Sequence, residues 1–170
     1  GTAYFVVSNP YMKGMADFAV VQKVGAHTIP GVTRERIVAE SQESLMSHPH
    51  LAASSAQEYF ASIGVLPGKN GFVEVTDNAT IFKFTDVDLT QSSSVMDSTL
   101  LVLMDIVGKD RHEVDSLDKK WFSTSDQAII VSGDIAHDVV VEKLRMLSYM
   151  VHPSESAQRQ EYVWKERLEP

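Results

Sequence analysis

Histidine and carboxylate side chains are the residues of this chain best suited to metal chemistry, but few of them are grouped in the sequence. His48 and His50 are separated by Pro49, and His112 is followed directly by Glu113. A catalytic zinc site needs three protein ligands that converge on the ion, and no third histidine lies near either group. The chain has no cysteine, which excludes thiolate metal sites, disulfides and cysteine nucleophiles. We therefore interpret both histidine segments as solvated loops.

The segment Ser132-Gly133-Asp134 lies between an apolar run and a helical pattern, where a nucleophile or a phosphate loop sometimes occurs. A serine nucleophile at such a turn requires the spacing Gly-x-Ser-x-Gly, which this sequence lacks. A phosphate-binding loop requires more glycines than this segment contains. We interpret it as a tight turn that leaves Asp134 near the N-terminus of a helix.

Composition and charge restrict the classes of function. The 170 residues are 44% hydrophobic and 22% charged, which is typical of a folded globular domain with one core. The formal net charge is -8, and nucleic-acid-binding surfaces are basic, so we expect no nucleic-acid partner. No run of about 18 apolar residues is present, and we therefore expect no membrane span in this segment.

The ends of the sequence suggest that it is an excised piece of a longer polypeptide. It begins Gly1-Thr2 without a methionine, and it stops in a polar stretch at Pro170. We expect residues 1–150 to form one domain and residues 151–170 to be a C-terminal extension or a linker to a following domain.

Apolar runs predict five strands, two of which read as a hairpin around Asp77-Asn78. Alternation in the second hairpin strand puts Phe82 and Phe84 on one face and Lys83 on the other. The run from 17 to 24 is mostly apolar, so we place that strand centrally in a sheet. The predicted strands span residues 3–8, 17–24, 71–76, 80–84 and 127–133.

Helical periodicity predicts four helices, which span residues 34–47, 55–63, 93–107 and 138–147. Ser55 and Glu58 have the spacing of a capping box, so Ser55 is the expected N-cap of the second helix. Gly64 is its expected end. Strand pairs combined with helices predict an α+β fold, with a mainly antiparallel sheet that is covered by helices on one side.

Several segments resemble the N-terminal lobe of the pitrilysin/insulinase-type zinc metallopeptidases, the inverzincins. Their order and spacing cover most of residues 4–149 and imply the fold of such a peptidase lobe. Residues 4–9 and 16–25 resemble the opening hairpin of the family. Residues 59–65 resemble the helix end that follows the zinc helix, and residues 118–122 with 127–135 resemble a late helix and strand.

The zinc chemistry of this family requires the motif H-x-x-E-H on a helix, where two histidines bind the ion and the glutamate is the base. An ungapped alignment places the motif on Val38, Ala39, Glu40, Ser41 and Gln42. A shift by one residue puts Glu40 at the position of the base but leaves Ile37 and Ser41 at the ligand positions. Neither alignment contains a histidine.

The third ligand of the family is a glutamate on a later helix, and the segment that would supply it is also missing. Only residues 109–117 bridge the place where the family has a long helical insert. The resemblance therefore implies a degenerate peptidase domain with no zinc, no other cofactor and no catalytic residues.

The family also holds substrate along an edge strand, typically with an Asn-Ala dipeptide, which falls here on Phe72-Val73. The candidate substrate edge is therefore Phe72, Val73, Glu74 and Val75. Main-chain pairing with an extended peptide needs only backbone N–H and C=O groups, so it can survive the loss of the asparagine.

Three hypotheses follow. The first is a non-catalytic half of a larger two-lobed peptidase assembly, whose partners are a homologous lobe or subunit and an extended peptide. The second is an active zinc peptidase with a site rebuilt from His48, His50 and a carboxylate such as Glu40 or Glu43. The third is a stand-alone protein-interaction module. The family resemblance suggests a periplasmic or cell-envelope location.

Overall fold

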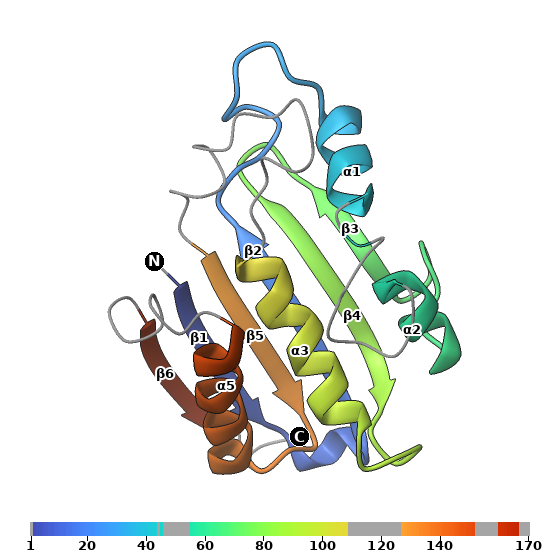
Figure 1. Cartoon of the computed structure of the whole chain (residues 1–170), viewed down its shortest axis with the longest axis vertical. Coiled ribbons are helices and arrows are strands. Elements are labelled where there is room, and N and C mark those ends of the chain that lie inside the picture. The colour runs from blue at the N-terminus through green and yellow to red at the C-terminus, as the bar shows by residue number, and fades with distance from the viewer. Residues whose placement is uncertain (1, 44, 46–54, 109–126, 152–159, 167–170) are drawn as a thin grey trace.

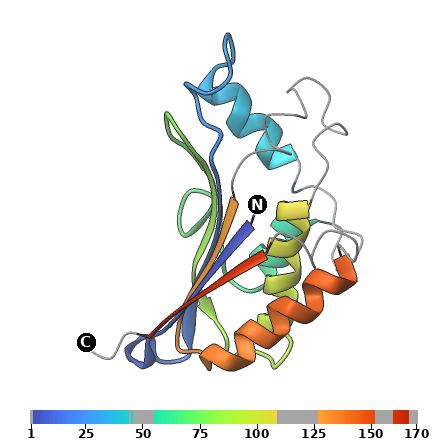
Figure 2. The same ribbon diagram turned by 90° about the vertical axis from the view of Figure 1, so that its left-hand side faces the viewer.

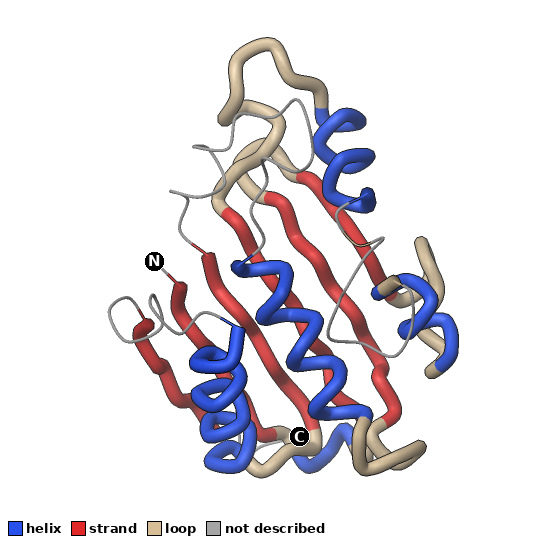
Figure 3. Tube along the Cα trace, viewed as in Figure 1, coloured by secondary structure: helices blue, strands red, loops and turns tan. Residues whose placement is uncertain are grey.

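The computed structural model describes residues 2–43, 45, 55–108, 127–151 and 160–166. Within these ranges the chain forms one sheet with helices packed against it (Figures 1 and 3). The strands are β1 (Thr2–Ser8), β2 (Met15–Gln22), β3 (Gly71–Val75), β4 (Thr80–Asp88), β5 (Gln127–Gly133) and β6 (Gln160–Glu166). The helices are the 3₁₀ turn η1 (Pro10–Met12), α1 (Arg34–Glu43), α2 (Ala56–Ser62), α3 (Val95–Gly108) and α5 (His137–Val151).

The described strands are hydrogen-bonded in the order β3-β4-β2-β5-β1-β6. β2 is antiparallel to β4 and β5, and β3 is antiparallel to β4. β1 runs parallel to both of its neighbours, β5 and β6. The expected α+β class is confirmed, and the sheet is mixed because of the two parallel ladders of β1.

The expected hairpin between β1 and β2 is wrong, because β5 lies between these two strands. Tyr4 of β1 and Val20 of β2 both pair with Ile129 of β5. The chain leaves β1 through η1, where the Asn9 side chain accepts a hydrogen bond from the Tyr11 backbone N–H. β1, β2 and β5 are adjacent in the strand order. They are apolar at successive positions, which is typical of strands in the interior of a sheet.

Within the segment 151–170, expected to be an extension or linker, the described residues Gln160–Glu166 form a strand of the sheet. α5 continues to Val151, and β6 pairs in parallel along the whole of β1. In the sequence, only three apolar residues lie between Gln160-Glu161 and Lys165-Glu166. Charged residues are common on edge strands, so the polarity that suggested a linker is also compatible with an edge.

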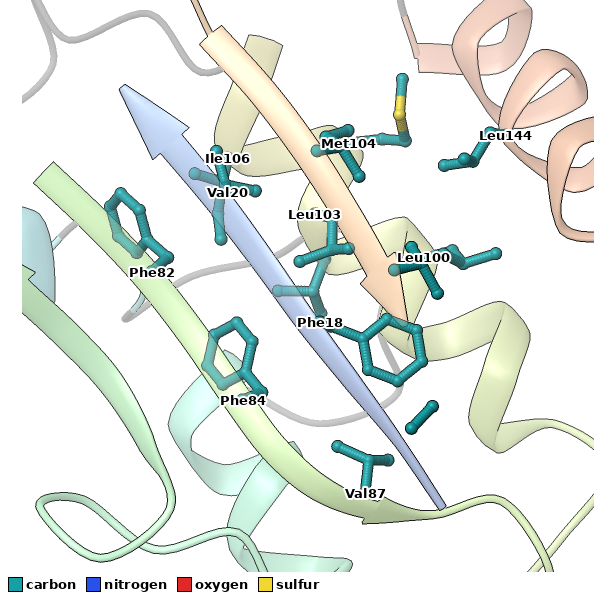
Figure 4. Close-up of a cluster of buried hydrophobic side chains, with 14 of the residues drawn as sticks. Phe18, Val20, Phe82, Phe84, Val87, Leu100, Leu103, Met104, Ile106 and Leu144 are labelled. Atoms are coloured by element: carbon teal, nitrogen blue, oxygen red, sulfur yellow. The ribbon is translucent and has the colours of Figure 1, made fainter. Parts of the chain in front are cut away.

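The described helices cover one face of the sheet (Figure 2). Phe18 and Val20 of β2 and Phe82 of β4 point into a core whose other wall is α3, with Leu103 fully buried at the contact (Figure 4). The predicted alternation in β4 is confirmed, because Phe82 and Phe84 are buried while Lys83 is exposed.

The helix ends follow the local signals with small shifts. Ser55 is the N-cap of α2, and its hydroxyl accepts a hydrogen bond from the Glu58 N–H at 3.1 Å, as the capping box predicts. α2 ends at Ser62, and Gly64 follows with a φ of 87°, a conformation that glycine adopts without strain. α1 ends at Glu43 instead of residue 47.

Candidate functional site

The helix on which the sequence alignment places the motif positions, α1, packs against the edge strand β3. Thr33 precedes it and accepts a hydrogen bond from the Arg36 N–H through its hydroxyl at 3.2 Å, as an N-cap does. Ile37 is fully buried in a cluster with Val24, Ile29 and Val75. The first motif-bearing turn of α1 is therefore fixed by apolar contacts with β3 and with the loop after β2.

The motif positions of α1 do not fit a zinc ion. Ile37 and Val38 have no lone pairs to donate, and Ser41 is completely buried. Gln42 is half-buried and offers only an amide. The Glu40 carboxylate, 9% exposed, accepts a hydrogen bond from the Arg36 Nε at 3.3 Å. The one acidic group at a motif position is thus engaged with a guanidinium on its own helix.

The remaining metal candidates lie elsewhere in the chain. Within the residues that the structure describes, no group of three or more His, Asp or Glu side chains is placed to hold a metal ion. His48, His50, His112 and Glu113 lie outside the described residues, as do residues 109–126, which include the segment 118–122 that resembles the late helix of the family.

The candidate substrate edge, β3, is paired with β4 on one side only. The Thr76 N–H donates to the Ala79 carbonyl at 2.8 Å, and the Thr85 N–H donates to the Asn70 carbonyl at 2.8 Å. In an antiparallel ladder these bonds alternate, so the N–H and C=O groups of Val73 and Val75 point away from β4. These two alternate residues of β3 therefore remain for pairing with another chain.

The start of this edge is closed by its own loop. The Gly68 N–H donates to the Gly71 carbonyl at 3.4 Å, and Pro67 forms a bridge with Gly71. The other end is held by the loop after β2, since the Ala26 N–H donates to the Thr76 carbonyl at 2.9 Å. Within the described residues, the part of the β3 edge left for pairing is therefore limited to Val73, which is half-buried, and Val75, which is 6% exposed.

The structure brings the two predicted site regions together. Val38 of α1 and Val73 of β3 are both half-buried and pack against the same cluster, which contains Ile37 and Val75. The side of α1 that would carry metal ligands in the family thus meets the candidate peptide edge. In this chain the contact between α1 and β3 is apolar.

An aromatic cluster behind β3 could not be derived from the sequence pattern. Phe72 has a φ of 94°, which is rare for a bulky residue. Its ring meets Phe84 at 5.7 Å and Phe60 at 6.2 Å between centroids, both edge to face. Phe60 and Phe84 are stacked at 3.9 Å. The unusual backbone at Phe72 therefore accompanies a ring that joins α2 to the sheet.

Beside this cluster, Tyr59 of α2 forms hydrogen bonds with residues of α3. Its hydroxyl donates to the Val95 carbonyl and lies 3.2 Å from the Thr99 Oγ1. Burial raises the pKa of the Tyr59 phenol, and hydrogen bonds with Thr99 and Ser98 partly oppose the shift. We assign Tyr59 a structural role, since it supports the aromatic cluster and does not reach the β3 edge.

This architecture is shared with solved proteases. The sequence matches no family model, and no curated protein is significantly similar to it. The first half of the periplasmic protease PqqL from Escherichia coli gives a TM-score of 0.61 at 10% identity, covering 98% of this chain and 47% of that chain. A predicted insulinase family protease from Yersinia pestis gives 0.59 at 7% identity, covering 83% and 42%. A protease from Helicobacter pylori gives 0.58 at 13% identity, covering 88% and 47%.

Identities this low establish the fold alone. The chain has an α+β fold that resembles a lobe of insulinase-type proteases, as the sequence resemblance implied. It spans less than half the length of the solved chains just described. Among the described helices, none combines the length and the apolar character that crossing a bilayer requires.

Proposed function

We propose that this chain is a peptidase-type lobe that does not hydrolyse peptides itself and serves as the scaffold or peptide-holding half of a larger assembly. The observation that carries the proposal is the apolar filling of the motif positions on α1. Ile37 is fully buried and Val38 half-buried against β3. Zinc peptidases need imidazole and carboxylate ligands at such positions, so the lobe keeps the scaffold of this chemistry without its ligands.

The peptide-holding part of the proposal rests on the β3 edge. An extended peptide can add a strand to an exposed edge, and its main-chain hydrogen bonds do not depend on its sequence. Val73 and Val75 supply the outward N–H and C=O groups, and Glu74 with Lys83 forms an exposed ion pair beside them at 3.0 Å. We expect affinity for unstructured peptides of broad sequence.

The partner is proposed to be a homologous lobe, in the same polypeptide or in a second subunit. The lengths of the solved chains support this proposal, because the first half of PqqL alone is about twice the matched length. A periplasmic or envelope location is proposed on the same basis, since PqqL is a periplasmic protease.

Zinc content and hydrolysis test the loss of activity. The purified protein, dialysed against zinc and then against buffer, is analysed for bound metal and incubated with unstructured peptides. We expect no stoichiometric zinc and no cleavage. Stoichiometric zinc together with chelator-sensitive cleavage would overturn the proposal and favour a site rebuilt around His48 and His50.

Edge pairing is tested with matched variants and probes. Val73→Pro removes an outward N–H while leaving the ladder with β4 intact, as edge strands tolerate, and Val73→Thr keeps that N–H. We expect fluorescence polarisation to report binding of labelled peptides by the Thr variant and weak binding by the Pro variant. A peptide methylated at alternate backbone nitrogens tests the same bonds without altering the protein. Equal binding of methylated and unmethylated peptides would rule out edge pairing.

A further inference from the structure

Of the three asparagines in this chain, Asn70 is the one that a glycine follows. An asparagine side chain can react with the peptide nitrogen of the next residue. A glycine in that place favours the reaction, because it has no Cβ atom to shield the nitrogen. The other two asparagines precede a proline, which has no N–H, and an alanine. The pair Asn70-Gly71 is therefore the best suited in this chain to cyclise.

The folded structure holds the Asn70 side chain at both ends of its amide. The amide oxygen accepts a hydrogen bond from the Leu66 N–H at 2.8 Å, and the amide nitrogen donates to the Thr85 carbonyl at 3.1 Å. The Gly64 carbonyl oxygen lies 3.5 Å from the same nitrogen. We call these contacts the Asn70 clamp. The clamp ties the loop after α2 to β4, because Leu66 lies in that loop and Thr85 lies in β4.

The backbone of Asn70 is held as well. Its carbonyl accepts hydrogen bonds from the Thr85 N–H at 2.8 Å and the Thr85 Oγ1 at 3.1 Å, and its N–H donates to the Leu66 carbonyl at 3.2 Å. Cyclisation requires the side-chain carbonyl carbon to reach the Gly71 nitrogen. The side chain must therefore turn away from its partners, and the folded clamp protects Asn70 from the reaction.

Gly71 is required by its surroundings, so the reactive pair is built into the fold. A Cβ atom at this position would lie 2.8 Å from Val65 Cγ1 and 3.2 Å from the Lys83 carbonyl oxygen. Both distances are shorter than ordinary van der Waals contact between heavy atoms. The packing that closes the start of β3 thus demands a glycine directly after Asn70.

The start of β3 can open without unfolding of the whole domain. Residues 66–69 are exposed, and exposed segments with few buried contacts open at a lower free energy than the core does. Phe72, two residues after Asn70, has a φ of 94°. A residue with a Cβ atom is strained at this angle, and the strain is relieved when this end of the strand opens. Local opening therefore exposes Asn70 to cyclisation.

The reaction replaces an amide with a carboxylate. The Gly71 nitrogen attacks the side-chain carbonyl carbon of Asn70 and loses its proton, the amide leaves with that proton as ammonia, and a cyclic imide remains. Water then opens the ring at either carbonyl. The product is an aspartate joined to Gly71 through its α-carboxyl or through its side-chain carboxyl. A carboxylate cannot donate to the Thr85 carbonyl, and the second linkage also lengthens the main chain by one carbon.

We propose that Asn70 is a site of spontaneous, one-way deamidation, that the Asn70 clamp gates the reaction, and that the product keeps the start of β3 open. The Gly68 N–H donates to the Gly71 carbonyl at 3.4 Å, and this contact is lost together with the clamp. Refolding does not restore the amide, so each molecule keeps a chemical record that this end of the sheet has opened. The proposal is independent of zinc and of peptide binding.

Peptide mapping by mass spectrometry tests the site and its protection. The purified chain is incubated at mildly alkaline pH in buffer and in denaturing urea, and deamidation is followed at Asn70 and at Asn78. We expect Asn70 to react many-fold faster in urea than in buffer, and many-fold faster than Asn78 in urea. Equal rates at Asn70 in buffer and urea would overturn the proposal, as would equal rates at the two asparagines in urea.

The gate is tested with a hydroxyl deletion. Thr85→Val removes the Oγ1 that donates to the Asn70 carbonyl and keeps the backbone carbonyl that the side chain binds. We expect several-fold faster deamidation of Asn70 in buffer and an unchanged rate in urea. The matched control Thr90→Val removes a hydroxyl beyond the end of β4 and should alter neither rate. An unchanged rate in buffer for the folded Thr85→Val variant would overturn the proposal.

If Thr85→Val fails to fold, low concentrations of urea apply the same test to the unaltered chain. Deamidation of Asn70 should accelerate at urea concentrations below the unfolding transition, because local opening precedes global unfolding. Acceleration that begins only with global unfolding would overturn the proposal.

The effect of the product is measured by hydrogen exchange. Asn70→Asp reproduces the product with the ordinary main-chain linkage, and we expect many-fold faster exchange at the Leu66 and Thr85 amides. Asn78→Asp adds the same charge at an exposed position of the hairpin turn and should leave both amides unchanged. Unchanged exchange in Asn70→Asp would overturn the proposal, whatever the zinc content and peptide binding of the chain.

Discussion

The two faces of the sheet are built from the same strands and differ in how completely they are buried. On the covered face, strand side chains that include Phe18, Phe82 and Phe84 are buried in the core that α3 completes (Figure 4). On the opposite face of β1, β2 and β5, which we call the open face, aliphatic side chains such as Val21 and Ile130 stay half-buried. The comparison teaches that one face is a complete core, whereas the other has the apolar composition of a core and no described helix over it.

The largest expected difference between the faces is measured by two adjacent isoleucines. Ile129 is fully buried on the covered face, and Ile130 is half-buried on the open face of the same strand. Ile129→Ala should lower the free energy of unfolding by about 2–5 kcal/mol, because it removes buried methyl groups and leaves a cavity. Ile130→Ala should cost about 1 kcal/mol, as is common for single substitutions. Urea unfolding of the isolated chain measures both.

Because residue type and strand are identical, strand propensity cancels between these two variants. Equal losses would contradict the comparison, since they would mean that the open face is already covered within the isolated chain.

Backbone strain at the edge gives the next largest effect. Phe72 has a φ of 94°, a value that is disfavoured for any residue with a Cβ atom. Phe72→Ala loses the ring and keeps the strain, whereas Phe72→Gly loses the ring and relieves it. The glycine variant should therefore be the more stable of the two by about 1 kcal/mol, the reverse of the order seen at regular strand positions. Thermal unfolding of the two variants checks the sign, and a more stable alanine variant would refute the strain.

The fold was predictable from the sequence where local signals agreed with the long-range packing. The Ser55 cap and the alternation of Phe82 with Lys83 both follow from chemistry within a few residues, and both predictions are confirmed. The order of strands was not predictable in this way. The parallel pairing of β1 with β5 joins residues more than a hundred positions apart, and apolar runs do not specify which neighbour they select.

The candidate site was predictable only in part. The family resemblance placed the motif positions on α1 and the candidate peptide edge on β3, and their roles stay predictions. The structure packs Val38 and Val73 against one cluster. The positive φ of Phe72 gave no signal, because phenylalanine is an ordinary strand residue. The open face did give a signal, since the apolar strand at residues 17–24 was expected to be central. That no described helix covers this face appears only when the helices are placed.

The open face makes a smaller, collective prediction for the isolated chain. The double variant Val21→Thr and Ile130→Thr keeps β-branched side chains, which suit strands, and adds hydroxyl groups that water can solvate. It should reduce the binding of an apolar fluorescent dye and any concentration-dependent association. The control Ile81→Thr lies at the margin of the open face and should have a weaker effect. Unchanged dye binding by the double variant would mean that this face is not what the dye detects.

The smallest expected effect lies at the end of β4, at Asp88. Hydrogen bonds from the Thr90 hydroxyl at 2.6 Å and the Thr90 N–H at 2.9 Å lower the pKa of Asp88. A carboxyl with a lowered pKa adds stability above its unfolded pKa and loses it as the pH falls through the folded value. Thr90→Val removes the hydroxyl alone, so the Asp88 pKa should rise towards its ordinary value without reaching it, while Thr90→Ser should keep it low. Carboxyl-carbon NMR titration distinguishes the two, and an unchanged pKa in the valine variant would show that the backbone N–H suffices.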